Sequence, residues 1–199
     1  MKAIFFLFYT QFCFAYHMVI LGDSLTEGYG VNKHKAYPAL LAEKLKTELQ
    51  EIKITASAVS GSLSSSGPSR LKWILKQNVD LVVIELGAND ILRGLPAEQL
   101  EQNLLKMVEI LADKNVSALV TEMKTPPNYG EAKQQNYAAV YSRLQKQGVQ
   151  IIPFMLEGVA GEKKYNLDDG IHPNEQGHQK IAENLYQYFK KYFQSKGLL

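Results

Sequence analysis

Cysteine and histidine, two of the side chains most often used to hold metal ions, are scarce in this sequence. The 199 residues include one cysteine, Cys13, and four scattered histidines. A structural zinc site needs several such ligands at short spacings, and a disulfide needs a second cysteine. The sequence therefore gives no sign of a zinc site, and it allows no disulfide within the chain.

An excess of charge of one sign is also missing. Lysines and arginines number 22 against 20 acidic residues, for a formal net charge of +2. A balance this small does not favour nucleic acid or an anionic membrane as a partner. The composition is that of an ordinary globular protein, with 46% hydrophobic and 21% charged residues. At this length we expect one domain with a sizeable core.

The N-terminal 15 residues differ from the rest of the chain. Lys2 precedes the mostly apolar stretch Ala3–Phe14, and the small residue Ala15 follows it. This pattern predicts a short secretory signal peptide over 1–15, because the stretch is shorter than the roughly 20 residues that span a bilayer. The alternatives are an extra N-terminal strand or a membrane-associated tail. The bulky pair Gln11-Phe12 argues against lipid modification of Cys13. We expect a single domain over 16–199 in a periplasmic or secreted protein.

Short apolar runs alternate with helical patterns five times along the chain. This alternation predicts a three-layer α/β/α fold with a five-stranded parallel sheet, doubly wound in the flavodoxin-like order 2-1-3-4-5. The second strand alternates apolar and polar residues, which is typical of an edge. Helices are expected from Pro38, from Pro68, around Leu100–Leu111, around Tyr137–Leu144 and from Asn174. The expected strands are Met18–Leu21, Ile52–Ala58, Leu81–Ile84, Ser117–Thr121 and Val149–Phe154.

Unusual polar residues follow several of these strands. Ser24 follows the first strand, Gly61 the second and Asn89 the third, while the segment Asp169–His172 lies between the fifth strand and the last helix. Loops at the carboxyl ends of parallel strands share one edge of the sheet, so these residues can meet. Taken singly, each has a simpler interpretation: Ser24 could cap a helix, and Asn89 could be an ordinary turn residue.

A serine becomes a nucleophile only when a base takes its proton. His172 is the best-placed base, because a carboxylate that could orient its ring lies three residues before it, at Asp169. Asp168 is a competing partner, and spacing alone does not exclude it.

Four ordered blocks resemble the GDSL, or SGNH, hydrolase family. They are similar above all to its bacterial periplasmic branch, which has thioesterase, arylesterase and lysophospholipase activity. The blocks are Gly22-Asp23-Ser24-Leu25, Ser60-Gly61, Gly87-Ala88-Asn89-Asp90 and Asp169-Gly170-Ile171-His172-Pro173-Asn174. The segment Pro126–Gly130 is also similar to that branch. The Gly-x-Ser-x-Gly elbow of α/β-hydrolases does not surround Ser24.

The resemblance implies that Ser24 is the nucleophile, His172 the general base and Asp169 its partner. It also implies an oxyanion hole made by the backbone N–H groups of Ser24 and Gly61 and the side-chain amide of Asn89. No metal or cofactor is implied. Close relatives often carry an acidic residue after the block-two glycine, where this chain has Ser62. That departure bears on how the loop is anchored.

Apolar residues in the same loops predict a groove for an acyl chain. About half of them are expected to anchor loops on the core instead. We expect a monomeric esterase or thioesterase that cleaves small-molecule acyl esters, such as aryl esters, acyl thioesters or lysophospholipids, through an acyl-Ser24 intermediate. A carbohydrate O-acetylesterase and a non-catalytic binding module are the alternatives. The predicted substrate-binding residues are Ile91, Leu92, Leu95, Pro127, Tyr129 and Ile171.

Overall fold

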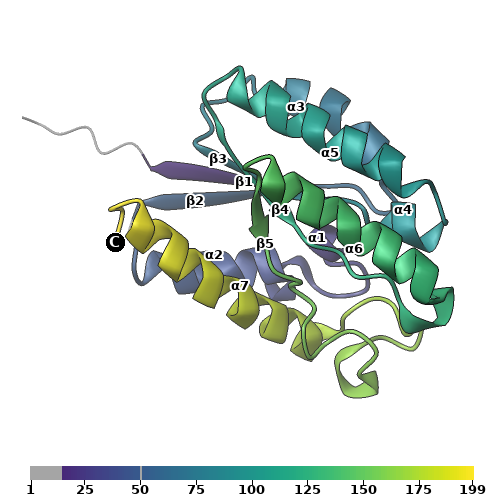
Figure 1. Cartoon of the computed structure of the whole chain (residues 1–199). Helices are drawn as coiled ribbons and strands as arrows, with labels where there is room; N and C mark the ends of the chain where they lie inside the picture. The colour runs from purple at the N-terminus through teal and green to yellow at the C-terminus, as the bar shows by residue number, and fades with distance from the viewer. Residues whose placement is uncertain (1–14, 50) are drawn as a thin grey trace, which may run out of the picture.

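A computed structural model describes residues 15–49 and 51–199, and a five-stranded parallel sheet lies at its centre (Figure 1). The strand order is β2-β1-β3-β4-β5, which confirms the predicted doubly wound topology. The strands are β1 (Tyr16–Gly22), β2 (Ile52–Ala58), β3 (Leu81–Glu85), β4 (Ser117–Thr121) and β5 (Gln150–Ile152).

The burial of each strand follows its place in the sheet. All five residues of β3 are buried, as are β1 residues from His17 to Gly22. Both strands have a neighbour on each side and helices on each face, so apolar runs suit them. β2 pairs only with β1 and mixes buried, half-buried and exposed residues, as expected of an edge.

The fifth strand is shorter than predicted. Only Gln150–Ile152 pair with β4, opposite Leu119–Thr121, whereas the sequence suggested Val149–Phe154. Pro153 has no N–H to donate and follows directly, so the ladder ends there.

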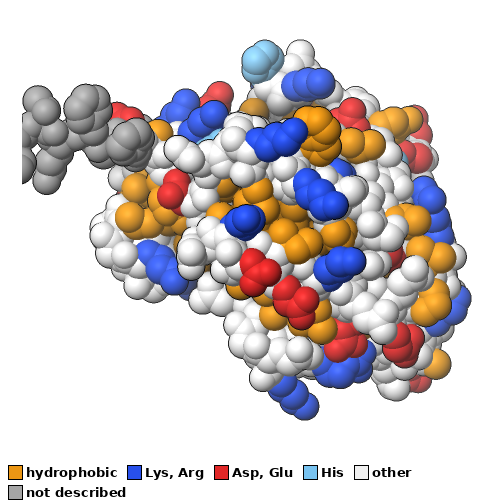
Figure 2. Space-filling view, turned by 90° about the horizontal axis from the view of Figure 1, so that it is seen from above, with side chains coloured by type: hydrophobic (Ala, Val, Ile, Leu, Met, Phe, Trp, Pro, Cys, Tyr) orange, Lys and Arg blue, Asp and Glu red, His pale blue; other side chains and the backbone are white. Residues whose placement is uncertain are grey.

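Helices cover both faces of the sheet. Figure 1 shows α2 and α7 side by side on one face and α3, α5 and α6 on the other. Figure 2 shows the face that carries α3 and α5, where basic side chains are interspersed with acidic and apolar ones. The five longer helices are α2 (Tyr37–Lys46), α3 (Gly67–Ile74), α5 (Ala97–Ala112), α6 (Glu131–Lys146) and α7 (Glu175–Ser195).

Two short helices lie immediately after β1 and β3. They are α1 (Ser24–Glu27) and α4 (Ala88–Leu92), and the sequence indicated a helix only at the first, where Ser24 was a possible cap. α1 ends after one turn because Gly28 has a left-handed backbone, with φ of 74°. Both helices begin at the carboxyl edge of the sheet, which brings the first and third loops of the predicted site together.

The predicted signal peptide falls almost entirely on residues 1–14, which lie outside the described residues. Across residues 15–49 and 51–199, no helix is both long and apolar enough to cross a membrane.

Candidate active site

The turn that carries Ser24 leads directly from β1 into α1. Asp23 caps this helix, since its Oδ1 accepts a hydrogen bond from the N–H of Leu25 at 3.0 Å. The turn leaves no room for a side chain at Gly22, where a Cβ would lie 2.0 Å from Oγ1 of Thr26. Because Asp23 is the cap, the hydroxyl of Ser24 is available to another partner.

That partner is His172, from the loop before α7. Ser24 Oγ lies 3.0 Å from His172 Nε2, and Nδ1 of the same ring lies 2.7 Å from Asp169 Oδ2. A base that takes a proton from a hydroxyl needs this order of contacts, with the carboxylate holding the ring from the far side. The fold thus brings together side chains that are 148 residues apart in sequence.

Asp169 is fixed by its own turn as well as by the imidazole. Its Oδ1 accepts the N–H groups of Ile171 and His172, both at 2.9 Å, across Gly170 with φ of 70°. The backbone and side-chain hydrogen bonds from His172, followed by that from Ile171, lower the pKa of Asp169 to about 2. The carboxylate is therefore ionised throughout the neutral range.

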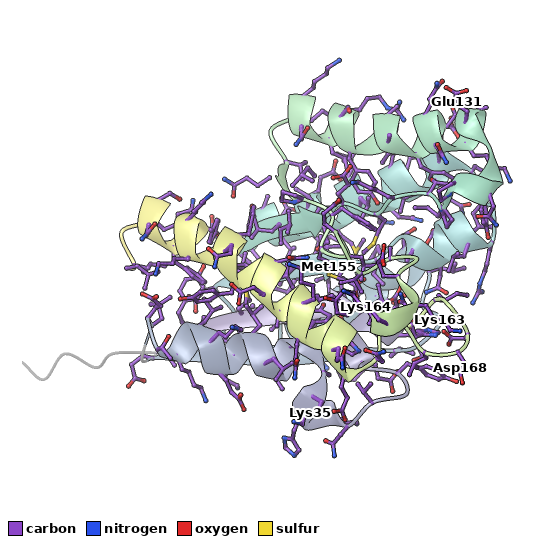
Figure 3. The ribbon with its side chains drawn as sticks, turned by 90° about the horizontal axis from the view of Figure 1, so that it is seen from below. Lys35, Glu131, Met155, Lys163, Lys164 and Asp168 are labelled. Carbon is purple, nitrogen blue, oxygen red and sulfur yellow. The ribbon has the colours of Figure 1, made fainter. Side chains whose placement is uncertain are left out.

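Asp168, the competing carboxylate, lies on the exposed outer part of the same loop. Figure 3 labels it beside Lys163, at the rim of the molecule. Within the described part of the chain, the only carboxylate that bonds to the ring of His172 is Asp169. The geometry therefore favours Asp169 over Asp168 as the partner of His172.

The loop after β2 is held from two sides. The N–H and hydroxyl of Ser60 donate to Glu27 Oε2 at 3.0 and 2.5 Å, and Arg93 Nη2 donates to the carbonyl of Gly61 at 3.1 Å. Gly61 has φ of 76°, a conformation that favours glycine. These contacts fix the backbone at the predicted oxyanion position.

The side chain of Asn89 is positioned by Asp23. Its Nδ2 donates to Asp23 Oδ2 at 2.9 Å. An amide carries two N–H bonds, so the second can serve another acceptor. This link was not predicted from the sequence, where Asp23 stands only as a member of the first block. The adjacency of the two parent strands was the one available signal.

A second carboxylate joins the loops after β2 and β3. Buried Asp90 accepts the N–H and the hydroxyl of Ser64 at 2.8 and 2.6 Å. Ser62, at the position where relatives often have an acid, accepts from Arg70 Nη1 at 3.2 Å. From the sequence, Asp90 had no role beyond its place in the third block, directly after Asn89.

One predicted groove residue requires correction. Ile91 is 1% exposed and belongs to the hydrophobic core, so its side chain is taken up by packing and cannot line a surface groove. Leu92 and Leu95 are half-buried. The carbonyl of Leu92 accepts from the hydroxyl of Tyr129 at 2.9 Å, and that of Leu95 accepts from the hydroxyl of Tyr137.

The other predicted substrate residues remain accessible. Pro127 is exposed, Tyr129 is half-buried, and Ile171 is 53% exposed beside His172. The sequence analysis missed Tyr29, which is 52% exposed and has its ring centroid 4.5 Å from that of His172. Only its aromatic character, in the loop after the serine block, could have indicated it.

Metal-binding clusters are not found in residues 15–49 and 51–199: no group of three or more histidine, cysteine or acidic side chains could hold an ion there. Asp23 and Asp169, the acids on either side of the Ser24–His172 contact in the site, are hydrogen-bonded to nitrogen groups of the protein.

Comparison with known proteins agrees with this geometry. The model of the GDSL-like lipase/acylhydrolase family matches residues 20–180. The chain is 36% identical to an arylesterase of Vibrio mimicus over 177 residues, which are 88% of each protein. It is also 36% identical to thioesterase 1/protease 1/lysophospholipase L1 of Escherichia coli K12, over 83% of this chain and 79% of that protein.

Solved structures show the same relationship. The crystal structure of the esterase EstA from Pseudoalteromonas, inhibited by monoethylphosphonate, has a TM-score of 0.84 and 29% identity, covering 89% of this chain and 98% of its own. The crystal structure of TesA also has a TM-score of 0.84, with 32% identity over 92% and 99% of the two chains. With its sheet order, its site geometry and these relatives in agreement, the chain belongs to the GDSL-like lipase/acylhydrolase family.

Proposed function

We propose that this enzyme hydrolyses acyl esters and thioesters through a covalent acyl-Ser24 intermediate. The observation that carries the proposal is the continuous chain of contacts from Ser24 Oγ through the imidazole of His172 to Asp169. Such a chain converts a weakly nucleophilic hydroxyl into one that can attack a carbonyl.

In the first half-reaction, Ser24 Oγ bonds to the carbonyl carbon and its proton passes to His172 Nε2. The tetrahedral intermediate then collapses, the carbon–oxygen or carbon–sulfur bond breaks, and Nε2 returns the proton to the leaving group. In the second half-reaction, water attacks the acyl carbon and gives a proton to Nε2. Collapse breaks the bond to Oγ, and Ser24 recovers its proton.

The oxyanion of each tetrahedral intermediate needs donors that are already in position. The N–H groups of Ser24 and Gly61 and the side-chain amide of Asn89 are the candidates. Their support is that Arg93 and Glu27 hold the Gly61 loop, while Asp23 holds the amide. Removing one such donor typically costs about 10²–10³ in rate.

The substrate class that we propose has an apolar acyl group and an apolar or aromatic leaving group. Leu92, Leu95, Pro127 and Tyr129 are the candidate acyl contacts, with Ile91 now left out. Tyr29 supplies an exposed aromatic surface against His172, the residue that would protonate the leaving group. Relatives named arylesterase and thioesterase/lysophospholipase are consistent with this choice.

We further propose that the protein acts in the periplasm or outside the cell, after removal of residues 1–15. The support is the sequence pattern of those residues. Intact-mass measurement of the protein recovered from its native compartment checks this, since a protein that retains Met1 would contradict it.

The function is tested with matched oxygen esters and thioesters of increasing acyl length, assayed on wild type and Ser24→Ala. We expect wild type to cleave both series, with kcat/KM rising from acetyl to medium-length chains, and the variant to cleave neither. Activity that falls sharply beyond acetyl would instead favour the O-acetylesterase. Absence of turnover in both series would favour a binding module.

A further inference from the structure

A fully buried acid, Glu85, lies behind the Ser24 turn and has no role in the proposed reaction cycle. It is the last residue of β3, the central strand of the sheet (Figure 1), and it is 0% exposed. Its Oε2 accepts the hydroxyl of Thr26 at 2.5 Å and the N–H of Asp23 at 3.4 Å. Glu85 therefore contacts the residue before Ser24 and the residue two positions after it.

The turn is built around this carboxyl. A Cβ at Gly22 would lie 2.5 Å from Glu85 Oε2, so the absence of a side chain there is what lets the acid approach. The hydroxyl of Tyr37 lies 2.7 Å from Thr26 Oγ1. Because Thr26 donates to Glu85, Tyr37 donates to Thr26, which gives a buried relay of donors that ends at Oε2.

We propose that Glu85 is a positioning residue for Ser24, and that it braces the nucleophile turn as an un-ionised acid. It touches neither the serine hydroxyl nor the imidazole. The proposal rests on the proposed function, because it concerns the geometry of the same nucleophile.

The hydrogen bonds show which of the two buried acids carries the proton. Both oxygens of Asp23 have a donor, from Leu25 and Asn89, whereas Glu85 Oε1 is buried without a hydrogen-bond partner in the described structure. Burying an ionised carboxylate oxygen without a hydrogen-bond donor costs far more free energy than burying an un-ionised carboxyl group. The structure therefore assigns the negative charge to Asp23 and the proton to Oε1 of Glu85.

The charged and titratable groups around Glu85 agree with this assignment. Asp23 repels a second negative charge, the phenols of Tyr37 and Tyr141 are neutral, and Arg70 is the cation of the region. Arg70 donates to Ser62 and to the carbonyl of Ser57, and the described residues contain no ion pair to either acid. Burial, with repulsion by Asp23 second, raises the pKa of Glu85 well above its ordinary value.

The protonation state has a signature that does not depend on activity. Above the ordinary glutamate pKa of 4.5, the folded protein keeps a proton at Glu85 that the unfolded chain releases. The unfolded state then binds fewer protons, so stability falls as pH rises, by up to about tenfold in the folding equilibrium constant per pH unit. The variant Glu85→Gln imitates the neutral acid and lacks this dependence.

The deciding experiment compares wild type and Glu85→Gln by denaturant unfolding between pH 5 and 8. The variant should gain stability relative to wild type as pH rises, and its kcat should stay within about threefold of wild type. A stability difference that is constant over this range, or a loss of kcat beyond tenfold, would overturn the un-ionised assignment. Other titrating groups are common to both proteins and cancel in the comparison.

The positioning role is tested by removing the brace. Glu85→Ala should lower kcat by at least tenfold with little change in KM, while Val83→Ala, on the same strand, should lose stability and keep its kcat. If Glu85→Ala does not fold, Thr26→Val removes one donor to Oε2 and keeps the branched shape; its kcat should also fall. Unchanged kcat in either folded variant contradicts the proposal. Failure of the proposed function is distinct, because it would leave wild type itself without acylation at Ser24.

Discussion

Asp169 contacts His172, whereas Asp23 and Glu85 contact the Ser24 turn itself. These acids lie in opposite environments. The side chain of Asp169 is 38% exposed and receives two backbone N–H groups and the imidazole, and its pKa falls to about 2. Asp23 and Glu85 are buried, and burial is the largest effect on each: it raises the pKa of Asp23 to about 6 and the pKa of Glu85 well above its ordinary value. The number of hydrogen-bond donors around each carboxyl group and its exposure to solvent, not the residue type, determine whether it is charged.

The difference indicates that the exposed acid and the buried acids have different roles. A carboxylate that stabilises a transient imidazolium has to remain charged, and the exposed, hydrogen-bonded position of Asp169 provides this. A residue that braces a turn inside the protein has no such need, and a neutral acid serves there at lower cost. Variants of the exposed and the buried acids, and of the residues they contact, separate these two roles.

The largest effect is expected at His172, which links Ser24 to the exposed acid. His172→Ala should lower kcat by about 10⁴-fold or more, since removal of a catalytic base typically abolishes nearly all nucleophilic catalysis. Steady-state kinetics with an activated aryl ester measure this, and far-ultraviolet circular dichroism should show an unchanged fold. A loss below tenfold would remove His172 from its proposed role.

Neutralising the exposed acid is expected to be the next most damaging change. Asp169→Asn should lower kcat by about 10²–10⁴-fold, because the ring loses the charge that fixes its tautomer and stabilises its protonated form. The matched control is Asp168→Asn, one residue away and exposed, which should stay within about twofold of wild type. A larger loss at position 168 would reverse the assignment of the two acids.

Neutralising buried Asp23 should cost less and should depend on pH. Asp23→Asn places an amide opposite Asn89 and should lower kcat/KM by about tenfold at pH 8. This is less than the roughly 10²–10³ typical of removing an oxyanion donor, because the Asn89 amide is still present. Wild-type Asp23 itself becomes protonated as pH falls through about 6. The two pH profiles of kcat/KM should therefore converge near pH 5, and a constant gap between pH 5 and 8 would show that Asp23 does not titrate there.

The smallest expected effect is at Tyr29, which contacts the imidazole from outside the network of acids. Tyr29→Ala should lower kcat/KM for aryl esters by about two- to tenfold, which corresponds to the free energy of one aromatic contact. Tyr29→Phe is the control and should behave like wild type, because the stacking face is kept. Equal losses in both variants would assign the effect to the hydroxyl instead.

Much of the fold could be predicted from the sequence because it depends on local patterns. The apolar runs at Met18–Leu21 and Leu81–Ile84 are buried central strands, and the alternating run at Ile52–Ala58 is an edge. The end of β5 was misplaced because the apolar run Val149–Phe154 was taken as continuous, although Pro153 inside it has no N–H for the ladder. Helix α4 was missed because Asn89 and Asp90, near its start, are residue types typical of turns.

The site was predictable where its residues form spaced blocks, and less so where only packing defines a role. Ser24, Asp169 and His172 lie in such blocks, and the structure brings them within hydrogen-bond distance. The Asp23–Asn89 contact and the brace at Glu85 depend on which side chains face each other across β1 and β3. Ile91 was wrongly predicted to bind substrate, because the sequence does not show whether an apolar residue beside a site lines a groove or packs in the core.

The central claim, that Ser24 is the nucleophile activated by His172, is tested most directly by covalent labelling. The folded protein is treated with a fluorophosphonate and the adduct is mapped by peptide mass spectrometry, with Ser24→Ala and His172→Ala treated in parallel. The account predicts one stoichiometric adduct on Ser24, none on Ser24→Ala and strongly slowed labelling of His172→Ala. An adduct on another residue, or equal labelling of Ser24→Ala, would contradict it.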